Sequence, residues 1–323
     1  MSQIKDKLDD LLAKGRITQE QYEELIAAVS DEEAPETEQQ SLPVEPLPVQ
    51  TEPPSSPEKP PSASTAASHL TVRLVSEDLR VRGVPGLPAV RVVHGASSIT
   101  VQQQNNDVII ESNIAREGHT FFSFTINGFS TQIVELEVPA DIACDLKTVS
   151  GDIELEDLQG AVEVRSVSGD IQAHGLPRLT TVNSTSGDID IDECFLDGEA
   201  VSKSGDVDVD SCTIHGLLKS YSGDMGVEDS ILNDADVSTF SGDVQLNGVT
   251  IQSSARLRTT SGDVDASLNQ HDVLVDVDTR SGEATVRGPD INMRVQRQRI
   301  PVGKATVTLA AHSGSGDINI SLK

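Results

Sequence analysis

The sequence predicts a mainly β protein whose larger part is a β-solenoid, and two observations carry this prediction. A Ser-Gly-Asp tripeptide recurs through the second half of the chain at an almost constant interval, as from Ser150 to Ser168 and Ser186, and a fixed period is typical of repeat architectures. Apolar residues at fixed places before and after the tripeptide alternate with polar ones, as in strands that bury one face. Stacking the copies joins like strand to like strand and buries these apolar columns inside a coil.

The tripeptide is expected to form a tight corner in every turn. Glycine supplies backbone conformations with positive φ, and the aspartate after it can accept hydrogen bonds from N–H groups that a corner leaves unpaired. A serine or threonine two places before the tripeptide can hydrogen-bond from turn to turn. The predicted corners are formed by Ser150, Gly151, Asp152, Ser168, Gly169, Asp170, Ser186, Gly187, Asp188, Ser204, Gly205, Asp206, Ser222, Gly223, Asp224, Ser241, Gly242, Asp243, Ser261, Gly262, Asp263, Ser315, Gly316 and Asp317.

A variant copy begins at Ser281, and the long interval from there to Ser315 is expected to contain one more copy. The stretch from Arg297 to Val302 fits the repeat frame and makes ten copies in all. Arg299 is then expected in the column of corner acids, between two acidic neighbours with which it pairs. The other interpretation is a basic docking patch near this end. Its candidate residues are Arg294, Arg297, Arg299 and Lys304.

Composition limits the classes of function. The chain of 323 residues has no Trp, 2 Tyr and 6 Phe, so it has no large aromatic core, and a solenoid needs none. Its net charge of −28 argues against sequence-independent nucleic-acid binding and against adsorption to an anionic membrane. No apolar run is long enough to span a membrane, and the first residues show no signal-peptide pattern. We therefore expect a cytoplasmic protein that reaches a membrane or the cell surface only through a partner.

Residues 1–33 are predicted to form a helical hairpin. Apolar residues recur at helical spacing on both sides of Gly15, and Thr18 with Gln21 forms a capping box for the second helix. The hairpin is either a solvent-exposed unit or an association module whose apolar face another chain completes. Residues 11–25 resemble the short bacterial module called SHOCT. The resemblance implies self-association through residues 2–30, or attachment to a membrane-linked partner.

Residues 34–68 are rich in Pro, Glu and Ser and are predicted to be an extended, disordered tether. Residues 69–323 are assigned to the solenoid, with irregular first turns over 69–143 and regular repeats over 144–323. Asn127-Gly128 between two alternating runs predicts a hairpin in the first part. Four phenylalanines there either plug the open end of the coil or form an aromatic carbohydrate site. They are Phe121, Phe122, Phe124 and Phe129.

A second resemblance covers most of the remaining chain. The segment from Val134 to Asp141 reads V-E-L-E-V-P-A-D, and the serial S-G-D-[IV] pattern follows from Leu146. Together these resemble the bacterial DUF4097 family, whose members are also described as adhesin-like or Toastrack domains. Members with a SHOCT-like head occur in Gram-positive envelope-stress systems of the Lia type. The resemblance implies a regulatory or scaffolding role, with contacts to antimicrobial peptides or membrane-bound regulators, and it implies no catalytic residue.

Carboxylates recur four and six places after the corner serine. Some β-helices cleave polysaccharides with acids on an outer face, but a catalytic site needs one distinctive constellation, and these acids repeat turn after turn. No enzyme is therefore expected, and no catalytic residue, cofactor or metal ligand is assigned. Three interpretations of the acidic face stay open: a solvated surface, weak Ca²⁺ binding, and docking of a cationic peptide. The candidate residues are Glu154, Glu156, Asp190, Asp192, Asp208, Asp210 and Glu228.

The three cysteines are expected to be free and buried. Cys194 and Cys212 occupy the same place in adjacent copies, so they should stack inside the coil, and Cys144 is expected in another inner column. The favoured interpretation is a non-enzymatic scaffold or sensor of a bacterial envelope-stress response, which binds a membrane-linked regulator or cationic peptide through the acidic solenoid. The alternative is an adhesin-like binder of surface polymers such as polysaccharides, which requires export.

Overall fold

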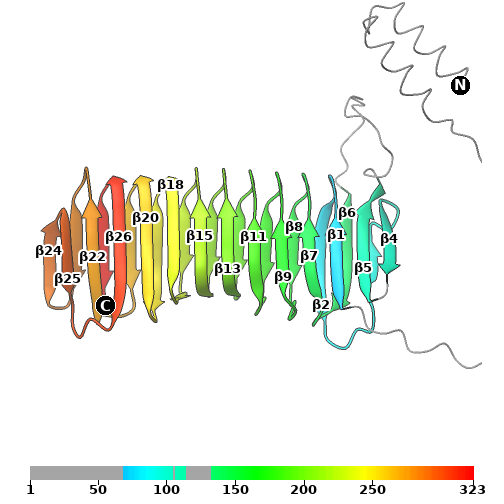
Figure 1. Ribbon diagram of the computed structural model, residues 1–323, viewed down its shortest axis with the longest axis horizontal. Helices are drawn as coiled ribbons and strands as arrows, with labels where there is room; N and C mark the ends of the chain where they lie inside the picture. The colour runs from blue at the N-terminus through cyan, green and yellow to red at the C-terminus, as the bar shows by residue number, and fades with distance from the viewer. Residues whose placement is uncertain (1–67, 105, 114–131) are drawn as a thin grey trace, which may run out of the picture. The chain divides into compact units, whose positions relative to one another are not determined.

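The computed structural model describes residues 68–104, 106–113 and 132–323, which form 27 strands stacked in two sheets (Figure 1). The mainly β solenoid predicted from the repeat is confirmed. The predicted N-terminal hairpin, the tether, the Asn127-Gly128 hairpin and the four phenylalanines of residues 121–129 lie outside the described residues. Those expectations stay predictions.

Sheet A contains the strand that precedes each corner. In stacking order its strands are β4 (Ile99–Gln104), β5 (Asp107–Ser112), β1 (His69–Arg73), β7 (Ala143–Lys147), β9 (Val162–Arg165), β11 (Leu179–Asn183), β13 (Phe195–Ser202), β15 (Thr213–Ser220), β17 (Ile231–Leu232) with β18 (Ala235–Ser241), β20 (Ser254–Ser261), β26 (Val307–Ser315), β22 (Val273–Thr279) and β25 (Arg297–Pro301).

Sheet B contains the strand that follows each corner. In stacking order its strands are β3 (Arg91–His94), β6 (Ile133–Pro139), β2 (Asp78–Val84), β8 (Ile153–Glu156), β10 (Ile171–His174), β12 (Ile189–Asp192), β14 (Val207–Asp210), β16 (Met225–Glu228), β19 (Val244–Ile251), β21 (Val264–Leu268), β27 (Ile318–Leu322), β23 (Ala284–Gly288) and β24 (Ile291–Val295).

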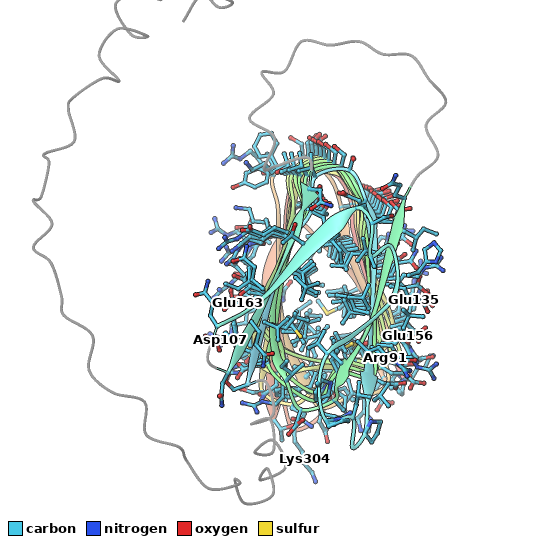
Figure 2. All side chains as sticks on the ribbon, turned by 90° about the vertical axis from the view of Figure 1, so that its right-hand side faces the viewer. Arg91, Asp107, Glu135, Glu156, Glu163 and Lys304 are labelled. Atoms are coloured by element: carbon cyan, nitrogen blue, oxygen red, sulfur yellow. The ribbon has the colours of Figure 1, made fainter. Side chains whose placement is uncertain are left out.

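The core lies between the two sheets and consists of the apolar columns that the repeat predicts. In the turn with Ser186, the side chains of Val182, Ile189 and Ile191 are at most 1% exposed. Ile189 is in register with Val207 of the next turn, so each buried side chain packs on its own equivalent. Seen end-on, the apolar side chains fill the interior, and the charged ones point outward from both sheets (Figure 2).

The stacking order departs from the chain order at the C-terminal end. Strands β26 and β27 lie between β20/β21 and β22/β23 instead of after them (Figure 1). The segment from Arg297 to Val302 is therefore not a tenth copy, because its strand β25 runs antiparallel to β22. The placement of Arg299 among the corner acids is also wrong. Arg299 is the Cα partner of Asp276, and Glu283 N donates directly to Asp317 Oδ1.

The N-terminal end is built in the same way. Strand β1 lies between β5 and β7, and β2 lies between β6 and β8. The antiparallel strands β4 and β3 then end the two sheets. The corner between β1 and β2 is Ser76-Glu77-Asp78, so the stretch expected to contain only irregular turns includes one regular turn of the repeat. An antiparallel strand at each end breaks the parallel pattern that another chain would otherwise extend.

The corner glycines are required by close approach of the backbone, and the expectation that they supply positive φ is wrong for seven of the nine. Of the nine, only Gly242 and Gly262 have positive φ, at 157° and 158°. A Cβ at Gly205 would lie 2.3 Å from the carbonyl oxygen of Gly187 in the neighbouring turn. Left-handed residues instead occupy the second turn of the six copies that begin at Ser150 to Ser241. They are Asp157, Gly175, Glu193, Ser211, Asp229 and Gly248.

The corner acids form a continuous hydrogen-bonded ladder. In each step the backbone N–H of one corner acid donates to Oδ1 of the preceding acid in the stack, as Asp206 does to Asp188 at 2.9 Å. The predicted role of the aspartate is confirmed, with the acceptor one turn away from the donor. In stacking order the ladder contains Asp78, Asp152, Asp170, Asp188, Asp206, Asp224, Asp243, Asp263, Asp317 and Glu283.

The hydroxyl column is buried and fixes the glycine backbone. Ser220 Oγ donates to Gly205 O at 2.9 Å, and Thr239 Oγ1 donates to Gly223 O at 2.8 Å. Bonding from turn to turn is therefore confirmed, with a glycine carbonyl rather than a second hydroxyl as partner. The members of the column are Thr148, Ser166, Ser184, Ser202, Ser220, Thr239, Thr259, Thr279 and Ser313.

Candidate functional site

Sheet B presents its outward side chains in two columns, four and six places after the corner serine. Parallel pairing in register brings equivalent residues of neighbouring strands to a separation of about 4.8 Å. Asp190 is paired with Asp208, Asp192 with Asp210, and Asp210 with Glu228 on the next strand. The structure thus brings these five predicted residues together on β12, β14 and β16. We call them the acidic cluster.

Glu154 and Glu156 occupy the same columns but do not belong to the acidic cluster. Strand β10 separates them from β12. On their other side, Arg80 Nε lies 2.8 Å from Glu154 Oε2, and Arg82 Nε lies 3.8 Å from Glu156 Oε2. The predicted cation-binding face is therefore narrower than the sequence pattern indicates, because two of its seven acids are already neutralised by arginines of β2.

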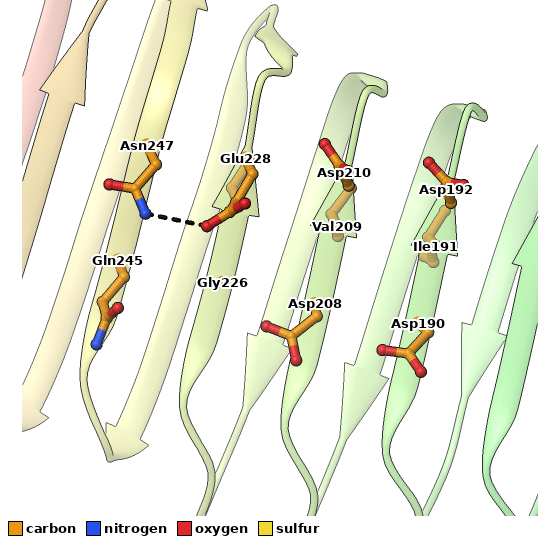
Figure 3. A pocket seen from close by; sticks show the side chains of 11 residues that line it. Asp190, Ile191, Asp192, Asp208, Val209, Asp210, Gly226, Glu228, Gln245 and Asn247 are labelled. Atoms are coloured by element: carbon orange, nitrogen blue, oxygen red, sulfur yellow. Dashed lines mark hydrogen bonds between the residues drawn. The ribbon is translucent and has the colours of Figure 1, made fainter.

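A hollow opens beside the acidic cluster where Gly226 leaves the outer column without a side chain. A Cβ at Gly226 would lie 2.1 Å from Asp208 Oδ1, so the carboxylate of Asp208 occupies part of the space above the glycine (Figure 3). The hollow has a volume of about 460 Å³. Gln245 and Asn247 border it on β19, and Asn247 Nδ2 donates to Glu228 Oε1 at 3.1 Å. We call this space the acidic hollow.

The charges around the acidic hollow repel one another. Burial raises the pKa of Asp208 above its ordinary value, and the carboxylates of Asp190 and Asp206 raise it further. The pKa of Asp190 is also raised by burial and then by the charges of Asp188 and Asp170. A raised carboxyl pKa means that the ionised form is disfavoured. Positive charge placed in the hollow would relieve this repulsion.

One member of the acidic cluster is hydrogen-bonded to a histidine. His174 Nδ1 lies 2.9 Å from Asp192 Oδ2, and this hydrogen bond raises the pKa of His174. Within the described part of the chain, no Lys, Arg or His side chain forms an ion pair with Asp190, Asp208 or Asp210. The same holds for Glu228, so in the described residues four of the five carboxylates of the acidic cluster have no ion-pair partner.

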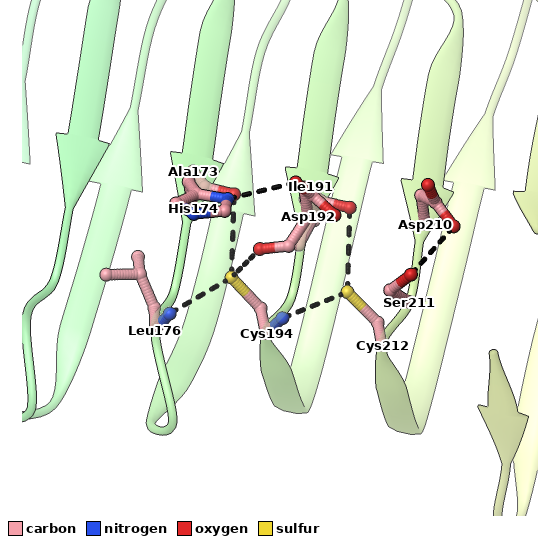
Figure 4. Close-up of polar contacts among 9 residues, drawn as sticks. All are labelled: Ala173, His174, Leu176, Ile191, Asp192, Cys194, Asp210, Ser211 and Cys212. Atoms are coloured by element: carbon pink, nitrogen blue, oxygen red, sulfur yellow. Dashed lines mark hydrogen bonds and ion pairs between the residues drawn. The ribbon is translucent and has the colours of Figure 1, made fainter. Parts of the chain in front are cut away.

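The cysteines have a structural explanation (Figure 4). All three are free and buried, as predicted. Leu176 N donates to Cys194 Sγ at 3.3 Å, Cys194 N to Cys212 Sγ at 3.2 Å, and Cys212 N to Ser230 Oγ at 2.9 Å. Each thiol or hydroxyl accepts from the N–H that the left-handed second turn leaves unpaired in the preceding copy. Burial raises the pKa of Cys144 to about 12, so that thiol is not a nucleophile near neutral pH.

The predicted basic docking residues are divided between the sheets. Arg294 is on β24 of sheet B and pairs with Glu283 at 3.5 Å. Arg297 is on β25 of sheet A and pairs with Asp278 at 3.3 Å. Lys304 follows β25, and its backbone N–H donates to Asp272. Two of the four positive charges are therefore already paired within the chain, and the docking patch stays a prediction.

Sequence reasoning missed three features that shape the site. Arg80 and Arg82 lie two and four places after Asp78, just as Glu154 and Glu156 lie two and four places after Asp152. Aligning Ser76-Glu77-Asp78 with the tripeptides therefore places each arginine in register with its acid. Gly226 interrupts an otherwise side-chain-bearing column, which is a signal for a hollow. The stacking order has no comparable signal in the spacing alone.

The described residues contain neither a metal-binding cluster nor a membrane-spanning helix. Among them, no group of three or more His, Cys, Asp or Glu side chains is arranged to hold a metal ion. Within the same part of the chain, no helix has the length and apolar character needed to cross a membrane.

Comparison with known proteins identifies the family. The model of the Toastrack DUF4097 family matches residues 61–193 and again residues 181–323. No curated protein matches the chain. Among solved structures, a presumed cell adhesion protein of Clostridium sporogenes is 11% identical, and the match covers 80% of this chain and 95% of that one with a TM-score of 0.23. Because the family model spans the whole described solenoid in two matches, the chain belongs to the Toastrack DUF4097 family.

Proposed function

We propose that this protein is a non-enzymatic scaffold or sensor of the bacterial cell envelope, which binds a cationic partner through the acidic hollow of sheet B. The observation that carries the proposal is the opening at Gly226, lined by the carboxylates of Asp190, Asp208, Asp210 and Glu228. The raised pKa values of Asp190 and Asp208 support it, because a cation stabilises the ionised form that burial disfavours. Family membership supports a binding role rather than catalysis.

The shape of the site favours a polymeric cation over a single ion. The carboxylates are spread over three strands and follow one another at about 4.8 Å along each column. A row of this kind matches the lysine or arginine side chains of an extended or helical peptide better than the compact oxygen cage that Ca²⁺ requires. The partner class is therefore a cationic peptide, or a cationic segment of a membrane-linked regulator that responds to envelope damage.

The site is tested with a fluorescein-labelled polylysine peptide and measured by fluorescence anisotropy. Replacing Asp190 and Asp208 together by Asn should weaken binding about tenfold, since each exposed charge pair contributes up to about 1 kcal/mol. The matched control replaces Glu154 and Glu156 by Gln. These two acids share the columns but already pair with arginines, so the control should bind like the unchanged protein. Equal losses in both variants would show that net charge alone attracts the peptide.

The cellular part of the proposal needs a separate test. Bacteria grown with and without a cell-wall-active antibiotic are fractionated, and proteins crosslinked to the chain are identified. Movement to the membrane fraction under stress, together with a defined partner, supports the scaffold role. Protein that stays in the medium or on the cell surface regardless of stress contradicts it and favours the adhesin-like alternative.

A further inference from the structure

A second exposed feature lies along the corner edge, away from the acidic hollow. Of the seven large hydrophobic side chains that are exposed in the described residues, four occupy the single column before the corner serine. They are Val149, Val167, Tyr221 and Phe240, which are 44%, 45%, 46% and 61% exposed. Burying such residues is favourable, and scattered exposure on a monomer does not select one column. This concentration needs a cause.

The column runs through eight successive turns and is mostly apolar, with Thr185, Lys203 and Thr260 as its polar members; we call it the apolar stripe. Its members are Val75, Val149, Val167, Thr185, Lys203, Tyr221, Phe240 and Thr260. Backbone bonds from the corner serine of one turn to the stripe residue of the preceding turn hold the column in register, as when Ser168 N donates to Val149 O and Ser241 N donates to Tyr221 O. At about 4.8 Å per turn the stripe is about 34 Å long. It is one side chain wide, which is too narrow for a groove but suits contact with another ridge.

Charge is arranged asymmetrically across the apolar stripe. On the sheet B side runs the ladder of corner acids, all of them negative. On the sheet A side, two residues before the stripe, the column carries positive side chains at several turns. They are Arg73, Lys147, Arg165, Lys219 and Arg258. Each of these five side chains also has a contact within the chain: Arg73 pairs with Glu111, Lys147 and Arg165 pair with Asp145, Arg258 pairs with Asp236, and Lys219 lies over the Tyr221 ring. The stripe is therefore flanked by a basic column on one side, partly compensated by acids of sheet A, and by an acidic column on the other.

A pattern of this kind is complementary to itself under one symmetry operation. A two-fold axis parallel to the stack places the positive column of one copy against the acid ladder of the other and joins the two apolar stripes. A two-fold axis perpendicular to the stack would instead put acids against acids. We propose that the apolar stripe is an interface between two copies of this chain, packed edge to edge in parallel and in register. Both copies have the same turn spacing, so the contact repeats along the stripe, except at Lys203, where two like charges face each other.

The expected interface is small, because a ridge about 34 Å long buries less than a standard interface does. The net charge of the whole chain opposes association, but in physiological salt the Debye length is about 8 Å, so charges beyond the edge contribute little. We therefore expect a reversible dimer whose stability depends on Tyr221 and Phe240. Aromatic side chains of this kind dominate the energy of small interfaces.

Crosslinking of the full-length chain distinguishes the arrangements. Val149→Cys and Phe240→Cys stand near opposite ends of the stripe, and the three native cysteines are buried. In the parallel dimer each variant should crosslink to itself through a short bis-maleimide. In an antiparallel dimer neither would crosslink to itself, but a mixture of the two would. Phe195→Cys, 40% exposed and outside the stripe, is the control that should not crosslink.

Sedimentation provides the second measurement. The double change Tyr221→Ser and Phe240→Ser should weaken dimerisation at least tenfold, while Phe195→Ser should leave it unchanged. An unchanged dimer in the double variant, without crosslinks at the stripe, assigns association to another surface and overturns the proposal. A monomeric protein whose double variant instead loses polylysine binding overturns it as well, and makes the stripe a peptide site.

Discussion

Replacing Gly205 by Ala tests whether close backbone approach is what the corner requires. The new Cβ would lie 2.3 Å from Gly187 O, 2.7 Å from its carbonyl carbon and 2.8 Å from Asp188 Oδ1. Two of these atoms belong to the backbone of the neighbouring turn, so the turns must separate. Separation strains the bond from Ser202 Oγ to Gly187 O and the bond from Asp206 N to Asp188 Oδ1.

The cost follows from these contacts. Overpacking in a rigid interior costs about 1–3 kcal/mol, and weakening two hydrogen bonds adds about 1 kcal/mol each. The Gly205→Ala variant should therefore lose about 3–5 kcal/mol of unfolding free energy. Gly226→Ala is the matched control. Its Cβ would also meet an atom at 2.1 Å, but that atom is Oδ1 of the Asp208 side chain, which can rotate away. Its cost should stay below about 1 kcal/mol.

Urea unfolding followed by circular dichroism measures both variants. Solenoids do not always unfold in one step, so amide hydrogen exchange in the turns around Gly205 and Gly226 accompanies the global measurement. If Gly205→Ala costs no more than Gly226→Ala, close approach is not the reason for the corner glycine. The conformational explanation would then have to be considered again for this position, even though its φ is not positive.

Three further predictions concern the same framework. Replacing Asp190 and Asp208 together by Asn should stabilise the protein near neutral pH, because the folded-state pKa values of both carboxyls are raised and the charged forms destabilise the fold above those values. The advantage of this variant in urea unfolding should shrink as the pH falls through the two pKa values. An advantage that stays constant with pH would contradict the repulsion. Cys212→Ser should unfold like the unchanged protein, because the hydroxyl can accept the hydrogen bond from Cys194 N. Cys212→Val should lose about 1–3 kcal/mol of unfolding free energy, because it leaves that N–H unpaired. Equal unfolding midpoints for the two variants would show that the acceptor is unimportant. Deleting residues 307–323 removes β26 and β27, the parallel partners of β22 and β23, so amide hydrogen exchange in β22 and β23 should approach that of an unfolded chain. Retained protection in β22 and β23 would mean that the two flanking turns can close the gap by themselves.

The regular part of the fold was predictable because each repeat position has a single physical role. The columns that contain Ile189 and Ile191 are apolar in nearly every copy, and the structure buries them in register. The acceptor role of the corner aspartate was also predictable from its place beside a bend. The role of the corner glycine was not predictable, because the sequence shows only that a glycine is present. It does not show whether the glycine is needed for positive φ or for close approach of another backbone. Only the distance of Gly205 from the neighbouring carbonyl separates the two needs.

The candidate site was predictable only in part. The positions of Asp190 and Asp208 followed from the period, but the neutralisation of Glu154 depended on Arg80, which lies far earlier in the chain. Arg80 is adjacent in space because β2 is inserted beside β8. Spacing along the chain gives the register within a turn, and it gives no information about which turns are neighbours when a terminal strand is inserted out of order.

The stacking order must be set by features that differ between copies, because identical columns allow any turn to stack on any other. The segment at Arg297 illustrates this. It has Gln298 where a corner needs glycine, so it cannot approach a neighbouring corner and pairs antiparallel to β22 instead. Glu77 is tolerated at a glycine position in the first regular turn because its carboxylate accepts bonds from Val75 N, Ser76 N and Ser112 Oγ. The departures from the tripeptide thus mark the ends of the parallel stack. The intact copies between them form the acidic face, in whose outer column Gly226 leaves the hollow.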